Sequence, residues 1–188
     1  MTLSCLPERT TPPRENGVTM MMDKGLSVSQ LESFLETSSD FTDIVKFGFG
    51  TGIISKNLKH KIKLLKQSGI RPYFGGTLFE LYYVRGQIDD YFRFVDDLKV
   101  DLIEISDGSI VLNHEEKCNL INKYSSNYTV LSEVGSKEEG IIVSPGKWIK
   151  MMSNELQAGS WKVIAEGRES GSVGIFRPNG NPHTMLIN

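Results

Sequence analysis

Charged residues stand within or just beyond successive apolar runs along this 188-residue chain. Lys46 lies inside the stretch IVKF, and Glu104 lies between Ile103 and Ile105, where core packing would avoid a charge. An isolated buried carboxylate is too costly to stay unpaired, so Glu104 needs a metal ion, a lysine or an arginine close by. The whole set consists of Asp23, Lys24, Lys46, Glu104, Asp107, Glu133, Lys137, Glu166, Arg168 and Glu169. As a set they predict a polar functional site, although any single member is as well explained by a solvated loop rim or a structural ion pair.

Glycine-rich segments follow two of the apolar runs. The segment GFGTG at 48–52 offers backbone N–H groups to a phosphate, but its spacing is neither that of a dinucleotide fold nor that of a P-loop. A tight turn is therefore the preferred interpretation of that segment. Gly75 and Gly76, followed by Thr77, resemble a turn into a helix N-terminus, which is a candidate anion site with an equally good structural explanation.

The elements that must position these residues alternate between strand and helix. Apolar runs predict strands at 18–22, 44–48, 71–74, 102–106, 129–134 and 162–165, and amphipathic segments predict helices at 29–37, 56–67, 88–98, 113–123 and 145–158. Continuous apolar strands are buried on both faces, which is typical of a parallel sheet wrapped by helices. Glycines after almost every strand favour a (β/α)8 barrel of the TIM type over an open doubly wound sheet. The alternation stops after six units, so the barrel is predicted to lack its last two strand–helix units.

Composition limits the domain organisation and the partners. We expect an irregular lead-in at 1–17, an incomplete barrel domain at 18–176 and an irregular tail at 177–188. The net charge of −2 gives no reason to expect nucleic acid or a membrane as partner, and no apolar run is long enough to span a bilayer. The N-terminus lacks the basic-then-apolar order of a secretory signal, so a cytoplasmic location is the expectation. Three scattered histidines and two cysteines without metal spacing argue against a zinc site or a disulfide framework.

Six segments, in order, resemble the phosphosulfolactate synthase (ComA) family: TMMMDKG, DIVKFGFGTGII, FGGTLFE, LIEISDGSI, VLSEVGSK and KVIAEGRESGSVGIF. The resemblance runs from about Arg9 to Phe176. It implies a (β/α)8 barrel and a lyase that uses Mg2+ to add sulfite to phosphoenolpyruvate, giving (2R)-phospho-3-sulfolactate. That reaction begins coenzyme M biosynthesis in methanogens and feeds sulfolactate formation in bacteria. The resemblance also implies a homo-oligomer.

The same resemblance implies roles for the charged residues. The candidate Mg2+ ligands are Glu104, Glu133, Glu166 and Asp23, because this hard cation prefers oxygen. Lys46 and Arg168 would hold the phosphate, carboxylate or sulfite groups, with Gly75 and Gly76 as further substrate-binding positions. Lys137 is the first candidate for the proton donor and Lys24 the second.

The chain departs from the family after its sixth unit. An FEAP-like block and an NLGNI- or NLANI-like block, which belong to the last two units in the family, do not occur. Many barrels bind phosphate with the loops after strands seven and eight, and a six-unit sheet leaves two edges open to association. A truncated, non-catalytic member with a structural or interaction role is therefore the main alternative. A different phosphate-binding barrel lyase or aldolase is the third.

Overall fold

Six short strands form one parallel sheet in which each strand pairs with the next along the chain. The computed structural model describes residues 4–5, 8, 10–135, 143–167, 171, 174–177, 179–182 and 184–187. The strands are β1 (Met20–Asp23), β2 (Ile44–Phe47), β3 (Arg71–Phe74), β4 (Leu102–Ser106), β5 (Thr129–Val134) and β6 (Lys162–Ala165). Because all pairs are parallel, the carboxyl ends of the six strands lie at the same edge of the sheet.

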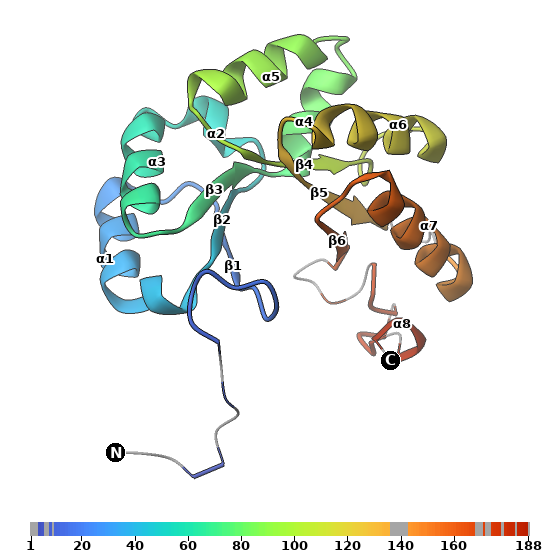
Figure 1. Cartoon of the computed structure of the whole chain (residues 1–188), viewed down its shortest axis with the longest axis horizontal. Coiled ribbons are helices and arrows are strands. Elements are labelled where there is room, and N and C mark those ends of the chain that lie inside the picture. The colour runs from blue at the N-terminus through green and yellow to red at the C-terminus, as the bar shows by residue number, and fades with distance from the viewer. Residues whose placement is uncertain are drawn as a thin grey trace.

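Helices connect the strands and lie along the outer side of the curved sheet (Figure 1). They are α1 (Val28–Ser38), α2 (Thr51–Ile54), α3 (Leu58–Gln67), α4 (Gly76–Tyr83), α5 (Ile88–Asp97), α6 (His114–Ser125) and α7 (Pro145–Ala158). A short 3-10 helix, η1 (Ser39–Phe41), follows α1, and one helical turn, α8 (Thr184–Ile187), lies near the C-terminus. Local chemistry defines the helix ends: the side chains of Ser27, Asn113 and Ser144 cap α1, α6 and α7.

The two faces of the sheet bury different side chains. The outer face presents residues such as Val45, Phe74 and Ile103 to the helices, and these belong to the large apolar core. The inner face carries a smaller apolar cluster of Ile44, Tyr73, Leu102 and Leu131, with Val18, Trp161 and Ile164 packed against it. Since side chains alternate along a strand, β2, β3, β4 and β5 contribute to both clusters, and the end residue of each strand is directed to one face or the other.

The predicted α/β architecture with six parallel strands is confirmed, while a closed eight-stranded barrel is not found in the described residues. β1 and β6 are the two edges of the sheet, so the described strands form a curled half-barrel. The first strand starts two residues later than predicted and includes Asp23. The sequence prediction missed α2, which is a single turn entered through Phe49 and Gly50 at positive φ, and gave only the start of α4. Among the described residues, no helix combines the length and apolar character required to cross a membrane.

Candidate functional site

Three charged side chains from three strands meet on the inner face of the sheet near its carboxyl edge. Lys46 of β2 donates to Glu104 Oε1 of β4 at 2.8 Å, and its Nζ lies 3.7 Å from Glu133 Oε2 of β5. All three are buried, Glu104 completely. We call Lys46, Glu104 and Glu133 the strand-end cluster.

Strand register places the members of this cluster on one face. Lys46 pairs with Tyr73, and Glu104 pairs with Leu131, whose side chains belong to the inner cluster. Ser106, two residues after Glu104 in β4, pairs with Glu133 of β5. The period of two along each strand therefore directs Lys46, Glu104 and Glu133 inward, at the end where α/β barrels carry their active sites.

Gly75 and Gly76 provide the space that the cluster occupies. A Cβ at Gly75 would lie 2.5 Å from Lys46 Cε, and one at Gly76 would lie 2.0 Å from Ser106 Oγ and 2.7 Å from Glu104 Oε1. The Gly76 amide donates to Glu104 Oε1 at 2.7 Å. The structure thus gives both glycines a packing reason, and their predicted role in substrate binding stays a prediction.

Burial and the neighbouring carboxylate disfavour the ionised form of Glu104, and the positive charge of Lys46 favours it. Burial raises the pKa of Glu104, Lys46 opposes that shift, and the nearby Glu133 adds to it. Tyr73 lies beside the cluster, and its burial, together with the charges of Glu104 and Glu133, raises its pKa well above the ordinary value. Tyr73 is consequently a neutral phenol at physiological pH and offers a hydrogen-bond donor rather than a base.

The cluster also has the oxygen donors that a divalent cation needs. Glu104 Oε2 is buried and makes no hydrogen bond within the described part of the chain. Among the described residues, two buried carboxylates lie close to one ammonium. Across the described ranges, no three His, Cys, Asp or Glu side chains form a ready-made metal site. Mg2+ commonly binds one or two carboxylates and completes its shell with water and substrate oxygens, so Glu104 and Glu133 fit such an ion.

Asp23 does not join this cluster, although it was predicted as a Mg2+ ligand. It pairs in register with Phe47 and therefore faces the helices, one residue past the inward-facing Met22. There it forms an ion pair with the buried Lys61 of α3 and accepts hydrogen bonds from the amides of Gly25 and Leu26, each at 2.8 Å. In the structure, Asp23 therefore anchors the turn after β1 to α3.

Replacing Asp23 with asparagine is expected to destabilise the fold without weakening metal binding. The change leaves Lys61 buried without its counter-ion, which typically costs about 3–5 kcal/mol. Urea unfolding measures the stability, and titration with Mn2+ as a paramagnetic substitute for Mg2+ measures the metal affinity. The double variant Asp23→Asn/Lys61→Met is the control, since it removes both charges and should recover most of the stability. A loss of Mn2+ affinity in the folded double variant would support the predicted role of Asp23 as a metal ligand.

Of the other predicted site residues, Lys24 and Glu166 belong to the described part of the chain. Lys24 lies close to the Phe49 ring, with its Nζ 5.9 Å from the ring centroid, and lines a cavity of about 340 Å³ together with Lys56 and Lys61.

Glu166 follows β6 and is buried, and its amide donates to Val134 O at 2.9 Å. Two residues beyond the inward-facing Ile164, it continues the inner face of β6. Lys137, Arg168 and Glu169 lie outside the described residues, so their predicted roles stay predictions.

Three polar residues near the cluster were missed from the sequence. Tyr73 stands next to Lys46 in register, and Ser106 donates a short hydrogen bond to Glu80 of α4; all three are buried. Alternation along LIEIS was the available signal for Ser106, because it places Ser106 on the same face as Glu104. The position of Tyr73 depends on the register of β3 with β2. No sequence signal identified Glu80, whose position depends on how α4 packs against β4.

Comparison with known proteins adds an independent finding. The family described as "(2R)-phospho-3-sulfolactate synthase (ComA)" matches residues 7–188. The chain is 36% identical over 184 residues to the phosphosulfolactate synthase of Bacillus subtilis, which covers 97% of this chain and 73% of that protein. It is 36% identical to the phosphosulfolactate synthase of Methanothermobacter thermautotrophicus (93% of this chain, 70% of that protein). It is 39% identical to that of Methanocaldococcus jannaschii (88% and 68%).

A solved structure gives a weaker likeness. A FabK mutant from Thermotoga maritima overlaps 79% of this chain and 43% of its own, with a TM-score of 0.47 and 16% identity. That overlap is too low to bear on the fold or the site.

Proposed function

This chain belongs to the (2R)-phospho-3-sulfolactate synthase (ComA) family, and from that premise we propose that it adds sulfite to phosphoenolpyruvate in a Mg2+-dependent reaction. The proposed product is (2R)-phospho-3-sulfolactate. The observation that supports this most directly is the strand-end cluster, where a buried lysine and two buried carboxylates meet at the carboxyl edge of a parallel sheet. Such a group suits a reaction that joins two anions around a cation.

The proposed reaction forms one carbon–sulfur bond and one carbon–hydrogen bond. The sulfur lone pair of sulfite attacks the methylene carbon of phosphoenolpyruvate, and the electron pair of the double bond moves toward the carboxylate. A proton then reaches the carbon that carries the phosphate, and the phosphate ester stays intact. The protein must therefore hold two anions together, stabilise charge on the carboxylate and deliver one proton.

Lys46 is the proposed electrostatic centre of the site. Its ammonium is held by Glu104 at 2.8 Å, so its position is fixed before substrate arrives. A preoriented cation costs no reorganisation when negative charge develops on the substrate. Arg168 is the second proposed anion-binding residue, and Tyr73 supplies a neutral hydroxyl beside the same cluster.

Glu104 and Glu133 are the proposed residues that would hold Mg2+, with Glu166 as a further candidate. When bound, the ion would neutralise substrate oxygens and stabilise the charge that develops on the carboxylate. Lys137 stays the first proposed proton donor and Lys24 the second.

The proposed activity is tested by incubating the purified chain with phosphoenolpyruvate, sulfite and Mg2+. We expect a new phosphate ester in the phosphorus NMR spectrum, with a mass equal to phosphoenolpyruvate plus sulfurous acid. The signal should require sulfite and should disappear when a chelator removes the metal. If a chain that is folded by circular dichroism gives no such product over a wide range of Mg2+ concentrations, the proposed function is wrong.

A second candidate function is a non-catalytic interaction role, and the open sheet favours it. β1 and β6 each pair with a single strand, so two parallel edges are available among the described elements. Open edges promote pairing with another chain. This candidate predicts a stable homo-oligomer without turnover, which light scattering during size-exclusion chromatography would detect. A monodisperse monomer that turns over would exclude it.

A further inference from the structure

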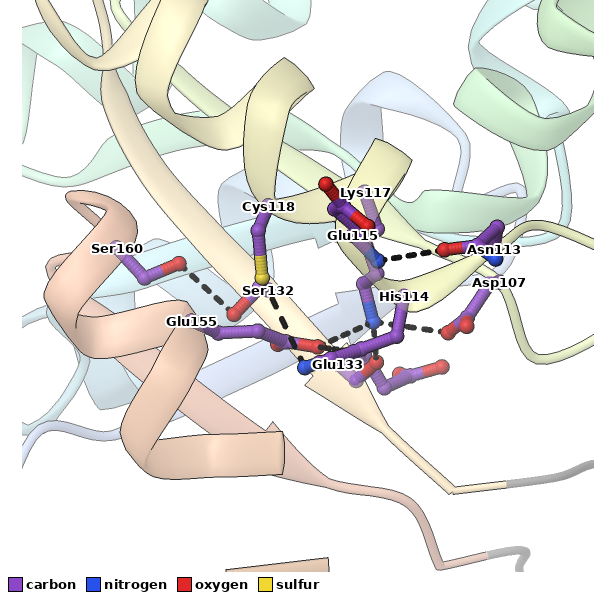
Figure 2. Close-up of polar contacts among 10 residues, drawn as sticks. All are labelled: Asp107, Asn113, His114, Glu115, Lys117, Cys118, Ser132, Glu133, Glu155 and Ser160. Atoms are coloured by element: carbon purple, nitrogen blue, oxygen red, sulfur yellow. Dashed lines mark hydrogen bonds and ion pairs between the residues drawn. The ribbon is translucent and has the colours of Figure 1, made fainter. Parts of the chain in front are cut away.

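A second group of buried charges lies between α6, α7 and the carboxyl ends of β4 and β5 (Figure 2). Lys117 of α6 is its centre. Its Nζ donates to Asp107 Oδ1 at 2.8 Å, lies 2.8 Å from Glu155 Oε1 of α7 and donates to the main-chain oxygen of Glu133 at 2.5 Å. Lys117 and Glu155 are both fully buried.

The group keeps Lys117 charged despite its burial. Burial by itself would lower the pKa of Lys117, but the carboxylates of Glu155 and Asp107 outweigh that effect and raise it. Burial lowers the pKa of the neighbouring His114, and Lys117 lowers it further, so His114 is neutral at physiological pH. Lys117 is therefore the permanent cation of this group.

The Cys118 thiol next to this group does not offer a separate activity. Its Sγ lies 3.7 Å from His114 Nε2, an arrangement that in other settings activates a nucleophile. Here burial raises the pKa of Cys118, and Glu155 raises it further, so the thiol stays protonated. The hydrogen bond from Lys117 to the Glu133 carbonyl has a structural consequence of its own.

That bond joins the second group to the strand-end cluster. The pairing of β4 with β5 ends at Ser106 and Glu133, and the chain leaves the sheet at Asp107. Lys117 donates to the Glu133 carbonyl and to the Asp107 carboxylate, and thereby ties together the ends of both strands. The side chain of the same Glu133 extends to the inner face, where its Oε2 lies 3.7 Å from Lys46 Nζ.

We propose that Lys117 is a positioning residue for the strand-end cluster: it holds the Glu133 main chain so that the carboxylate of Glu133 reaches Lys46 and would be in place to hold Mg2+. The proposal rests on the proposed function, since it assigns Glu133 a role in that site. Lys117 acts through Glu133 and does not itself contact substrate. Residues behind a metal ligand often set its geometry, and their loss typically weakens metal binding by about 10–100-fold.

A variant without the two fully buried charges separates positioning from stability. Lys117→Met alone would leave Glu155 buried without its cation, which can unfold the chain. The double variant Lys117→Met/Glu155→Gln removes the two fully buried charges and leaves the Asp107 carboxylate, which is partly exposed to solvent. Glu155→Gln alone is the matched control, because it alters the same network but leaves the Lys117 bonds to Glu133 and Asp107 in place.

The measurements are Mn2+ affinity, kcat and KM for phosphoenolpyruvate. In the double variant we expect Mn2+ to bind about tenfold more weakly and kcat to fall by a similar factor. The control Glu155→Gln should keep both within about twofold of the unsubstituted chain, and Lys117→Arg should recover part of the loss. Equal Mn2+ affinity and kcat in the double variant and in Glu155→Gln would overturn the proposal.

A double-mutant cycle tests the same link without any activity. All four variants of the cycle carry Glu155→Gln, which is the background. Thermal midpoints are compared for this background, for Lys117→Met in it, for Glu133→Gln in it, and for both changes together. If Lys117 holds Glu133 against Lys46, Glu133→Gln lowers the midpoint less when Lys117 is already replaced. Additive shifts would overturn the positioning role even in a chain that shows no turnover. Non-additive shifts in a chain without turnover would mean that the proposed reaction fails while the positioning link stands.

Discussion

Replacing Lys46 with methionine is expected to reduce turnover of phosphoenolpyruvate and sulfite about a thousandfold. The ammonium is the only cation that the described part of the strand-end cluster contributes, and its position is fixed by Glu104 and Glu133. Methionine keeps much of the length of the side chain but cannot stabilise negative charge. Steady-state kinetics at saturating Mg2+ measure the loss, which should appear mainly in kcat because the charge on the substrate grows in the transition state.

The same substitution should change how stability depends on pH. Lys46 lowers the pKa of Glu104, so its removal raises that pKa further. The folded variant then holds a proton on Glu104 that the unfolded chain releases above its ordinary value of 4.5. Since the folded state binds more protons in this range, the free energy of unfolding of the variant falls as pH rises. Urea unfolding from pH 4.5 to pH 8 should therefore show the deficit relative to the unsubstituted chain growing with pH.

A neutral pair provides the control for Lys46. Lys46→Met/Glu104→Gln has no buried charge to compensate at these two positions, so most of its stability should return and the pH dependence that comes from Glu104 should disappear. Its activity should stay low, because the cation is still missing. Near-normal turnover in either variant would show that Lys46 is not the electrostatic centre of the reaction.

Replacing Gly76 with alanine is expected to destabilise the fold by about 3 kcal/mol and to disrupt the strand-end cluster. The added Cβ would lie 2.0 Å from Ser106 Oγ and 2.5 Å from Ser106 Cβ, and 2.7 Å from Glu104 Oε1. Ser106 Cβ is attached directly to the backbone of β4, so it cannot rotate away. Either α4 or the end of β4 must shift, and the bond from the Gly76 amide to Glu104 is lost. Urea unfolding and the turnover assay measure the two effects.

Gly146 offers a matched control for Gly76. Both glycines lie in the first turn of a helix, but a Cβ at Gly146 meets no atom within 4 Å. Gly146→Ala should therefore stabilise the chain slightly, by up to about 1 kcal/mol, through helix propensity alone. A similar cost for both alanine variants would mean that backbone conformation, and not the crowding beside Ser106, explains the glycine at position 76.

Much of the architecture follows from local sequence pattern. Six continuous apolar runs separated by amphipathic segments predict a parallel α/β sheet, and all six strands are present in the structure. Lys46 and Glu104 were identifiable because a charge inside an apolar strand must find a partner, and the structure pairs them with each other. Alternation of side chains within a strand is a local property, so the sequence alone could align Lys46 with Ile44 and Gly48, while the fold showed that this is the inner face.

The tertiary structure decided what depends on register and on helix packing. Asp23 lies in β1, one residue past the inward-facing Met22. Its carboxylate therefore points to the outer face, where it pairs with Lys61, and not toward Lys46. The partners of Glu80, Asp107 and Lys117 lie on other elements, so no pattern within a single element encodes them. The sequence by itself therefore determined which strands form and that Lys46, Glu104 and Glu133 lie within them. Only the packed fold determined which of those charges meet, because distances between strands and helices are set by contacts that no single segment contains.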